Sequence, residues 1–207
     1  MDRNFPLKKG ITIMIIIDFL RIFNHDNEKV WKMKNDLLDL TLKRRSIRNY
    51  LDEDIDDEVI GEILNVALTA PSSWGGHPVH FIVVKDKEMI RKIAHCKAMG
   101  AAPLMRANAC IVVMADTSSC ELWIEDASVA SSYILLAAEQ FDIGACWIHI
   151  RNRAGQIKTA DEEIRDLLNV ADNFRVLNCV ALGIKGESKS GYLKEDLSLE
   201  NIHYEKY

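Results

Sequence analysis

The sequence lacks the motifs that mark the commonest nucleotide-binding and hydrolytic folds. Its 207 residues contain no G-x-G-x-x-G after a strand pattern, no G-x-x-x-x-G-K-[ST], no G-x-S-x-G and no H-E-x-x-H. These absences remove the usual support for a Rossmann, P-loop, α/β-hydrolase or zincin enzyme. The pairs His77/His80 and Cys146/His149 have no second cluster at a metal-binding spacing, so we predict no metal site.

Cysteine, proline and positive charge are also scarce. The five cysteines include no C-x-x-C pair and give no disulfide framework, which favours a reduced, cytoplasmic protein. With four prolines, 48% hydrophobic and 28% charged residues, the chain is neither collagen-like nor largely disordered. Its net charge of −5 argues against a protein that coats nucleic acid, so a local cluster must hold any anionic ligand.

The longest early apolar run, residues 11–17, ends at Asp18 and is shorter than the about 20 residues that span a bilayer. No small-x-small cleavage site follows it, so a secretory signal is not predicted. We interpret residues 1–34 as an N-terminal extension of uncertain structure. The favoured interpretations are a surface appendage or the product of an upstream start codon, with Met33 as the true start. The other interpretations are a membrane-surface helix and a dimer-packing helix. Residues 35–207 are predicted to form one domain.

Within that domain, helical and strand patterns alternate, which predicts a single α+β fold. Short apolar, β-branched runs indicate buried strands, and apolar residues at helical spacing indicate amphipathic helices. The expected strands are 81–84, 110–114, 145–150 and 176–182, and the expected helices begin at Asp36, near Asp54 and at Thr159. A further helix, 123–141, is apolar or small on almost every side, so it is predicted to need packing partners on several sides.

Two segments carry candidate binding chemistry. If the chain becomes extended after Arg45, the side chains of Arg44, Ser46 and Arg48 point to the same side, and two guanidinium forks beside a hydroxyl suit a phosphate. The alternative is a solvated basic helix end. Residues 70–78 combine Pro71, two serines, Trp74 and paired glycines in a tight loop whose backbone can approach a planar ligand, although such a segment is more often only a turn.

Together the motifs resemble the nitroreductase family of FMN-dependent oxidoreductases. The family pattern R-R-S-x-R-x-[FY] matches residues 44–50, A-P-[ST]-[SG] matches 70–73, and F-x-V-V matches 81–84. A W-x-x-D helix beginning at Trp123, the Cys146-Trp147 pair and an A-L-G strand end at 181–183 follow in the family order. The chain departs from the common pattern at 74–77, at Tyr133 and at Ala145, where many members carry asparagine or serine, so the resemblance does not carry substrate specificity.

The resemblance implies a three-layer α/β/α fold with a mostly antiparallel sheet, a homodimer, and active sites at the subunit interface. It implies that FMN passes electrons from NADH or NADPH to a small organic acceptor such as a nitroaromatic or quinone, by a ping-pong sequence at flavin N5 that needs no catalytic side chain. Alternatives are a non-catalytic flavin-binding protein and a specialised member such as a reductive dehalogenase. The C-terminal residues 203–207 are expected to reach the partner. The implied cofactor-binding residues, with Lys185 as an alternative to the last, are Arg44, Arg45, Ser46, Arg48, Pro71, Ser72, Ser73, Trp74, Trp147, Ile148 and Lys189.

Overall fold

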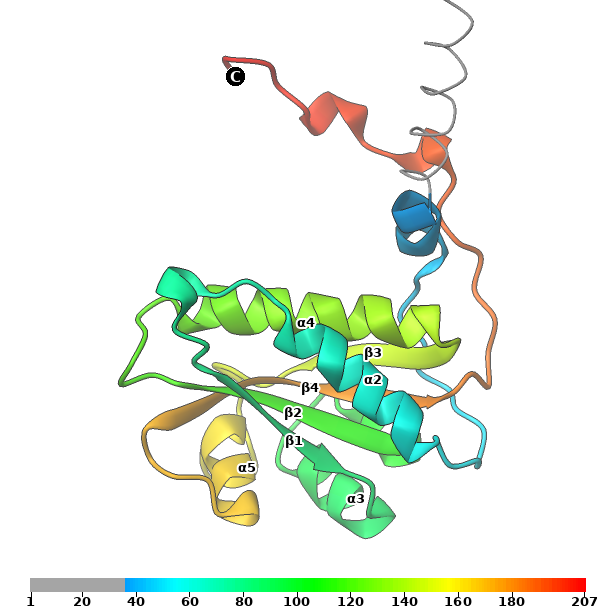
Figure 1. Ribbon diagram of the computed structural model, residues 1–207. Helices are drawn as coiled ribbons and strands as arrows, with labels where there is room; N and C mark the ends of the chain where they lie inside the picture. The colour runs from blue at the N-terminus through cyan, green and yellow to red at the C-terminus, as the bar shows by residue number, and fades with distance from the viewer. Residues whose placement is uncertain (1–35) are drawn as a thin grey trace, which may run out of the picture. The chain divides into compact units, whose positions relative to one another are not determined.

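The computed structural model describes residues 36–207 (Figure 1). Residues 36–43 are helical, and Leu42–Tyr207 form one compact unit. The interpretation of residues 1–34, including Met33 as a start, lies outside the described residues. Within 36–207, no helix combines the length and apolar character that a membrane span needs.

The unit Leu42–Tyr207 is built on a four-stranded antiparallel sheet. The strands are β1 (Val79–Val84), β2 (Ala109–Asp116), β3 (Ile143–His149) and β4 (Phe174–Ile184), in the order β1-β2-β4-β3. The two central strands, β2 and β4, are almost completely buried. This burial explains their continuous apolar runs, because a strand covered on both faces has no polar side. All four expected strands are present, each longer by one to four residues.

Helices cover both faces of this sheet (Figure 1). The helices α2 (Asp57–Leu68) and α4 (Trp123–Gln140) pack on one face, and α3 (Lys87–His95) and α5 (Ala160–Leu168) on the other. Two buried apolar clusters, one on each face, fill the spaces between sheet and helices. The predicted α+β fold with three layers and a mostly antiparallel sheet is therefore confirmed.

Local capping signals define the helix starts. Asp56 accepts a hydrogen bond from Glu58 N–H at the start of α2, and Thr159 and Glu162 form the expected capping box at the start of α5. Helix α3 was not predicted, although Asp86 caps it and Ile90 and Ile93 are buried beneath the sheet. Its apolar residues Met89, Ile90, Ile93 and Ala94 do follow a helical spacing, so the sequence held a signal that the prediction missed. Short 3-10 turns complete the unit at Ser73–Gly75, Ala102–Arg106, Lys194–Asp196 and Leu199–Asn201.

Helix α4 is covered on one side only by its own chain. Ala127, Ile134 and Ala138 face the core, whereas Val129 is 37% exposed and Tyr133 and Leu136 are half-buried on the opposite stripe. The expectation that α4 is buried on all sides therefore fails within one chain. The reason is that α2 and the sheet are its only extensive neighbours among the described residues.

Candidate functional site

The basic segment 44–50 lies along the outer edge of β3. Ser46 pairs with Ala145 in a parallel bridge, and Ile47 N–H donates to Ala145 O at 3.0 Å. Gly144 makes this approach possible, because a Cβ at that position would lie 2.8 Å from Cγ2 of Ile47. Tyr50 fixes the end of the segment by donating from its hydroxyl to the Ile47 carbonyl at 2.7 Å.

Four polar groups of the predicted phosphate site converge beside this edge. Nζ of Lys189 donates to the Ser46 carbonyl at 2.7 Å. Burial raises the pKa of the Cys146 thiol in β3, while the nearby positive charges of Arg48, Lys189 and Arg44 act to lower it. Arg48 also donates from Nη1 to the Ser46 carbonyl, at 3.3 Å, so Arg48 and Lys189 meet at one residue that pairs with β3. Within Leu42–Tyr207, neither Arg44 nor Arg48 forms an ion pair with a carboxylate, so both guanidinium groups have donors to offer an anion.

The Glu187 side chain binds the main chain of the same segment. Its Oε1 accepts from Arg48 N–H at 2.6 Å and from Asn49 N–H at 3.3 Å, and Lys189 Nζ lies 3.2 Å away. The hydrogen bond from Arg48 N–H is the largest influence that lowers the pKa of this carboxyl group. Glu187 thus holds residues 48–49 in place while it partly neutralises Lys189.

Arg45 faces away from this group. Its guanidinium donates to the Ser190 carbonyl and lies over the Tyr192 ring, 4.7 Å from the centroid. A cavity of about 510 Å³ is lined by Arg45 and Lys189 together with the carboxylates of Glu139, Asp142 and Glu187. Because these three carboxylates line the cavity and Arg44 and Arg48 do not, the side of those two guanidinium groups is the better anion site.

The two lysines proposed for the phosphate site have different surroundings. Lys185 donates to both carboxylate oxygens of Glu139, at 3.0 and 3.1 Å, and to Asp142 at 2.9 Å. Burial acts to lower the pKa of Lys185, but these hydrogen bonds outweigh it and raise the pKa. Because the Lys185 side chain neutralises the buried Glu139, Lys189 is the better candidate of the two lysines for the phosphate.

Beyond Ala145, no main-chain group of residues 36–207 pairs with the outer edge of β3, which we call the open edge. Ile150 N–H bonds to Leu177 O of β4, so by antiparallel alternation the main-chain groups of Ile148 face β4 and those of Trp147 and His149 face outward. The predicted backbone contact of Trp147 is therefore available, whereas the N–H of Ile148 is turned inward. His149 was not predicted, and its outward N–H follows only from the register.

The loop that carries Pro71, Ser72, Ser73 and Trp74 is anchored on α4. Asp126, which is 5% exposed, accepts from Ser73 N–H at 3.0 Å and from the Ser73 hydroxyl at 2.8 Å. Trp74 and His77 adopt left-handed backbone conformations, with φ of 56° and 45°, and the Trp74 side chain is 96% exposed. Strained backbone of this kind persists where surrounding contacts enforce it, and it clusters at binding sites.

The loop and the basic segment do not meet within one chain. Ser73 contacts Asp126 in the first turn of α4, whereas Lys185 contacts Glu139 in the last turn. These two turns are about 20 Å apart at 1.5 Å per residue. The structure therefore brings Ser46, Arg48 and Lys189 together beside Ala145, with Arg44 on the same segment, and leaves residues 71–74 at the first turn of the helix.

Comparison with known proteins decides the family. A nitroreductase family profile matches residues 41–122. A protein of Archaeoglobus fulgidus, provisionally named NADH dehydrogenase/NAD(P)H nitroreductase, is 38% identical over 175 residues, which cover 82% of this chain and 98% of that protein. The chain belongs to the nitroreductase family. A protein of Methanothermobacter thermautotrophicus with the same provisional name is 32% identical and covers 91% of this chain and 95% of its own length.

A solved structure gives the same result. The FMN-dependent nitroreductase of Clostridium difficile R20291 is 39% identical, covers 81% of this chain and 98% of its own, and has a TM-score of 0.79. The family assignment made from the motifs is thereby confirmed, and with it the class of NAD(P)H-dependent flavin oxidoreductases.

The donor set of the basic segment fits FMN. Two guanidinium groups without carboxylate partners, one hydroxyl and one ammonium suit a phosphate, and the open edge of β3 offers main-chain N–H groups to a flat ring. Prediction from the motifs missed Glu187, Asp126 as an anchor, and His149. Of these three, only Asp126 could have been found from the sequence, because a carboxylate in the first turn of an apolar helix is conspicuous.

Proposed function

We propose that this protein is an FMN-dependent oxidoreductase that passes electrons from NADH or NADPH to a small organic acceptor, such as a nitroaromatic or a quinone, in a ping-pong sequence. One observation carries the proposal: Arg44, Ser46, Arg48 and Lys189 gather beside the open edge of β3 in a chain of this family. The relatives named for NAD(P)H and FMN support the choice of donor and cofactor.

Each group of residues has a distinct part in this proposal. Arg44, Arg48 and Lys189 hold the phosphate, with the Ser46 hydroxyl completing the donor set. Main-chain N–H groups of Trp147 and His149 face the flavin ring and orient it. Bound FMN supplies the hydride acceptor at N5, so no side chain is assigned as acid or base. Arg45 holds the C-terminal segment through Ser190 and Tyr192.

We propose that a second copy of the chain completes the site. Residues 71–74 lie at the start of α4, whereas Lys185, which follows β4 beside the basic segment, contacts the last turn, and α4 leaves Val129, Tyr133 and Leu136 uncovered. The C-terminal segment also exposes apolar side chains, with Leu199 at 65%, Ile202 at 54% and Tyr204 at 87%. A homodimer that packs α4 against α4 covers these surfaces and brings residues 71–74 to the partner's flavin.

A polar lid inserted between residues 85 and 109 would favour reductive dehalogenation. Instead, α3 buries Ile90 and Ile93 beneath the sheet, and Leu104 in the following turn is 1% exposed. The segment packs against the sheet, which gives no support to the dehalogenase alternative.

The absorption spectrum of the purified full-length protein tests the proposal. We expect the two flavin bands, bleaching of the longer-wavelength band by NADH or NADPH under anaerobic conditions, and recovery on addition of a quinone. A colourless protein that takes up no added FMN would overturn the proposal. Bleaching without recovery by any nitroaromatic or quinone would identify a flavin-binding protein rather than the proposed enzyme.

A further inference from the structure

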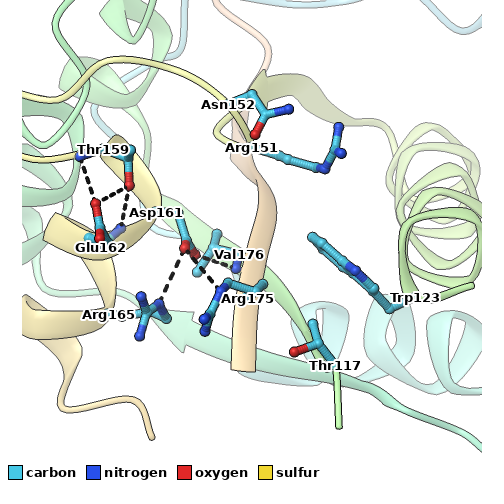
Figure 2. Close-up of a pocket in the computed structure, with 10 residues that line it drawn as sticks. All are labelled: Thr117, Trp123, Arg151, Asn152, Thr159, Asp161, Glu162, Arg165, Arg175 and Val176. Carbon is cyan, nitrogen blue, oxygen red and sulfur yellow. Dashed lines mark hydrogen bonds and ion pairs between the residues drawn. The ribbon is translucent and has the colours of Figure 1, made fainter. Parts of the chain in front are cut away.

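A second cavity lies where the C-terminal end of β3, the start of α4 and the start of α5 meet (Figure 2). Its volume is about 460 Å³, within the range of small-molecule sites. We call it the Arg151 pocket. Its lining includes Thr117, Trp123, Arg151, Asp161, Arg165 and Arg175.

The charges in the Arg151 pocket leave one guanidinium free. Asp161 pairs with Arg165, at 3.3 Å from Nε, and lies 3.9 Å from Nε of Arg175. The second carboxylate, Glu162, is occupied by the capping box with Thr159. Arg151 has no carboxylate partner within Leu42–Tyr207, so the pocket holds three arginines against two satisfied carboxylates. A site of this charge favours an anion.

Trp123 adds an aromatic face beside that free charge. The Arg151 guanidinium lies 6.0 Å from the Trp123 ring centroid, at the outer limit of a cation–π contact, so its donor fork stays available. Figure 2 shows Arg151 and Trp123 on one side of the cavity and the Asp161 group on the other. An aromatic plane beside a guanidinium fork suits a flat base that carries a phosphate.

The position of the Arg151 pocket relates it to the flavin site. Arg151 follows the end of β3, four residues beyond Trp147, which corresponds to about 13 Å along an extended chain. A ligand in the pocket is too distant to exchange hydride with a flavin at Trp147. A dinucleotide, however, has its reactive ring at one end and its adenosine phosphate at the other, and can reach from a flavin at Trp147 to Arg151.

We propose that the Arg151 pocket binds the adenine nucleotide half of the electron donor, with the base on Trp123 and a phosphate on Arg151. This inference rests on the proposed function, because it assumes that NADH or NADPH reduces a flavin bound beside β3. It names a specificity element for NADH or NADPH outside the flavin-binding residues.

Rapid reduction of the bound flavin tests this inference in the full-length protein. In Arg151→Gln we expect the dissociation constant for NADPH or NADH to rise about tenfold, since one charge-assisted contact is lost. The donor 1-benzyl-1,4-dihydronicotinamide has no nucleotide half, and its constant should change less than twofold. The matched control is Arg153→Gln, which removes the same charge from the same turn outside the pocket and should behave like the wild type.

Equal weakening for the benzyl donor, or unchanged NADPH and NADH constants, would overturn the inference. Calorimetry gives a readout that does not depend on flavin chemistry: adenosine 5′-monophosphate and 2′-monophosphate should bind the wild type and Arg153→Gln, and about tenfold more weakly Arg151→Gln. Preference for the 2′-phosphate would identify NADPH as the donor recognised, and preference for the 5′-phosphate would identify the pyrophosphate common to both donors. Failure of both NADH and NADPH to bleach the wild type would contradict the proposed function, while nucleotide binding would still decide the pocket.

Discussion

The Asp126 carboxylate accepts hydrogen bonds from both the main-chain N–H and the hydroxyl of Ser73, at 3.0 and 2.8 Å, so the first turn of α4 holds the loop that follows α2. The same loop presents Trp74 to solvent in a left-handed conformation. One buried side chain therefore connects the core to a surface that we propose faces the partner's flavin. Its removal should affect stability and cofactor binding together.

We predict that Asp126→Ala lowers the free energy of unfolding by about 2 kcal/mol, because the half-buried Ser73 N–H and hydroxyl both lose their acceptor. FMN affinity should fall with it, as the loop loses its fixed conformation. Urea unfolding and flavin titration measure the two effects. Ser128→Ala is the control, since this serine lies on the same helix and bonds only to Ile124 O. A stable Asp126→Ala protein with unchanged FMN affinity would contradict the anchoring role.

Substitution of Lys185 should affect stability, whereas substitution of Lys189 should affect FMN binding. Lys185→Met leaves Glu139, which is 5% exposed, with only the exposed Lys43 nearby, at 3.3 Å, and should cost about 3 kcal/mol of stability. Lys189→Met should leave the stability within about 1 kcal/mol and weaken FMN binding roughly tenfold, because it removes a phosphate contact. Denaturation and flavin titration of both variants check this. The reverse pattern would assign the phosphate to Lys185.

Arg44→Ala and Arg48→Ala should each weaken FMN binding by about tenfold to a hundredfold, because each removes a charge-assisted contact with the phosphate. Riboflavin, which lacks the phosphate, should bind wild type and variants alike. Equilibrium dialysis at low and high salt measures both ligands, and FMN binding by the wild type should weaken as salt rises. Unchanged FMN affinity in both variants would remove the phosphate assignment.

The fold could be predicted further than the site. Apolar strands such as 110–114 and the capping box at Thr159 are local patterns, and the structure contains both. The gathering of Lys189 beside Ser46, by contrast, depends on chain segments 143 residues apart that only the tertiary fold brings together. Likewise, the outward N–H of His149 follows from strand register, which cannot be read from the type of residue at that position.

The pH dependence of stability should reflect Glu187. Hydrogen bonds, first from Arg48 N–H, lower the pKa of this carboxyl group below its ordinary value of 4.5. A pKa that is lower in the folded state stabilises the protein above the unfolded value, and this stability is lost as the pH falls through the folded pKa. Unfolding of the FMN-free protein between pH 6 and pH 3 should therefore show a fall below about pH 4.5 that Glu187→Gln reduces. Identical pH profiles for the two proteins would contradict the assignment.

The uncovered stripe of α4 gives the sharpest test of a shared site. Val129→Glu places a carboxylate on the exposed stripe of α4, in the proposed contact between the two copies of this helix. We expect the variant to elute as a monomer and to bind FMN at least tenfold more weakly, because residues 71–74 no longer reach the flavin. Glu125→Gln, on the same helix and exposed, is the control and should stay dimeric. A monomeric Val129→Glu protein with wild-type FMN affinity would show that each chain holds its flavin alone, and light scattering with flavin titration distinguishes the two results.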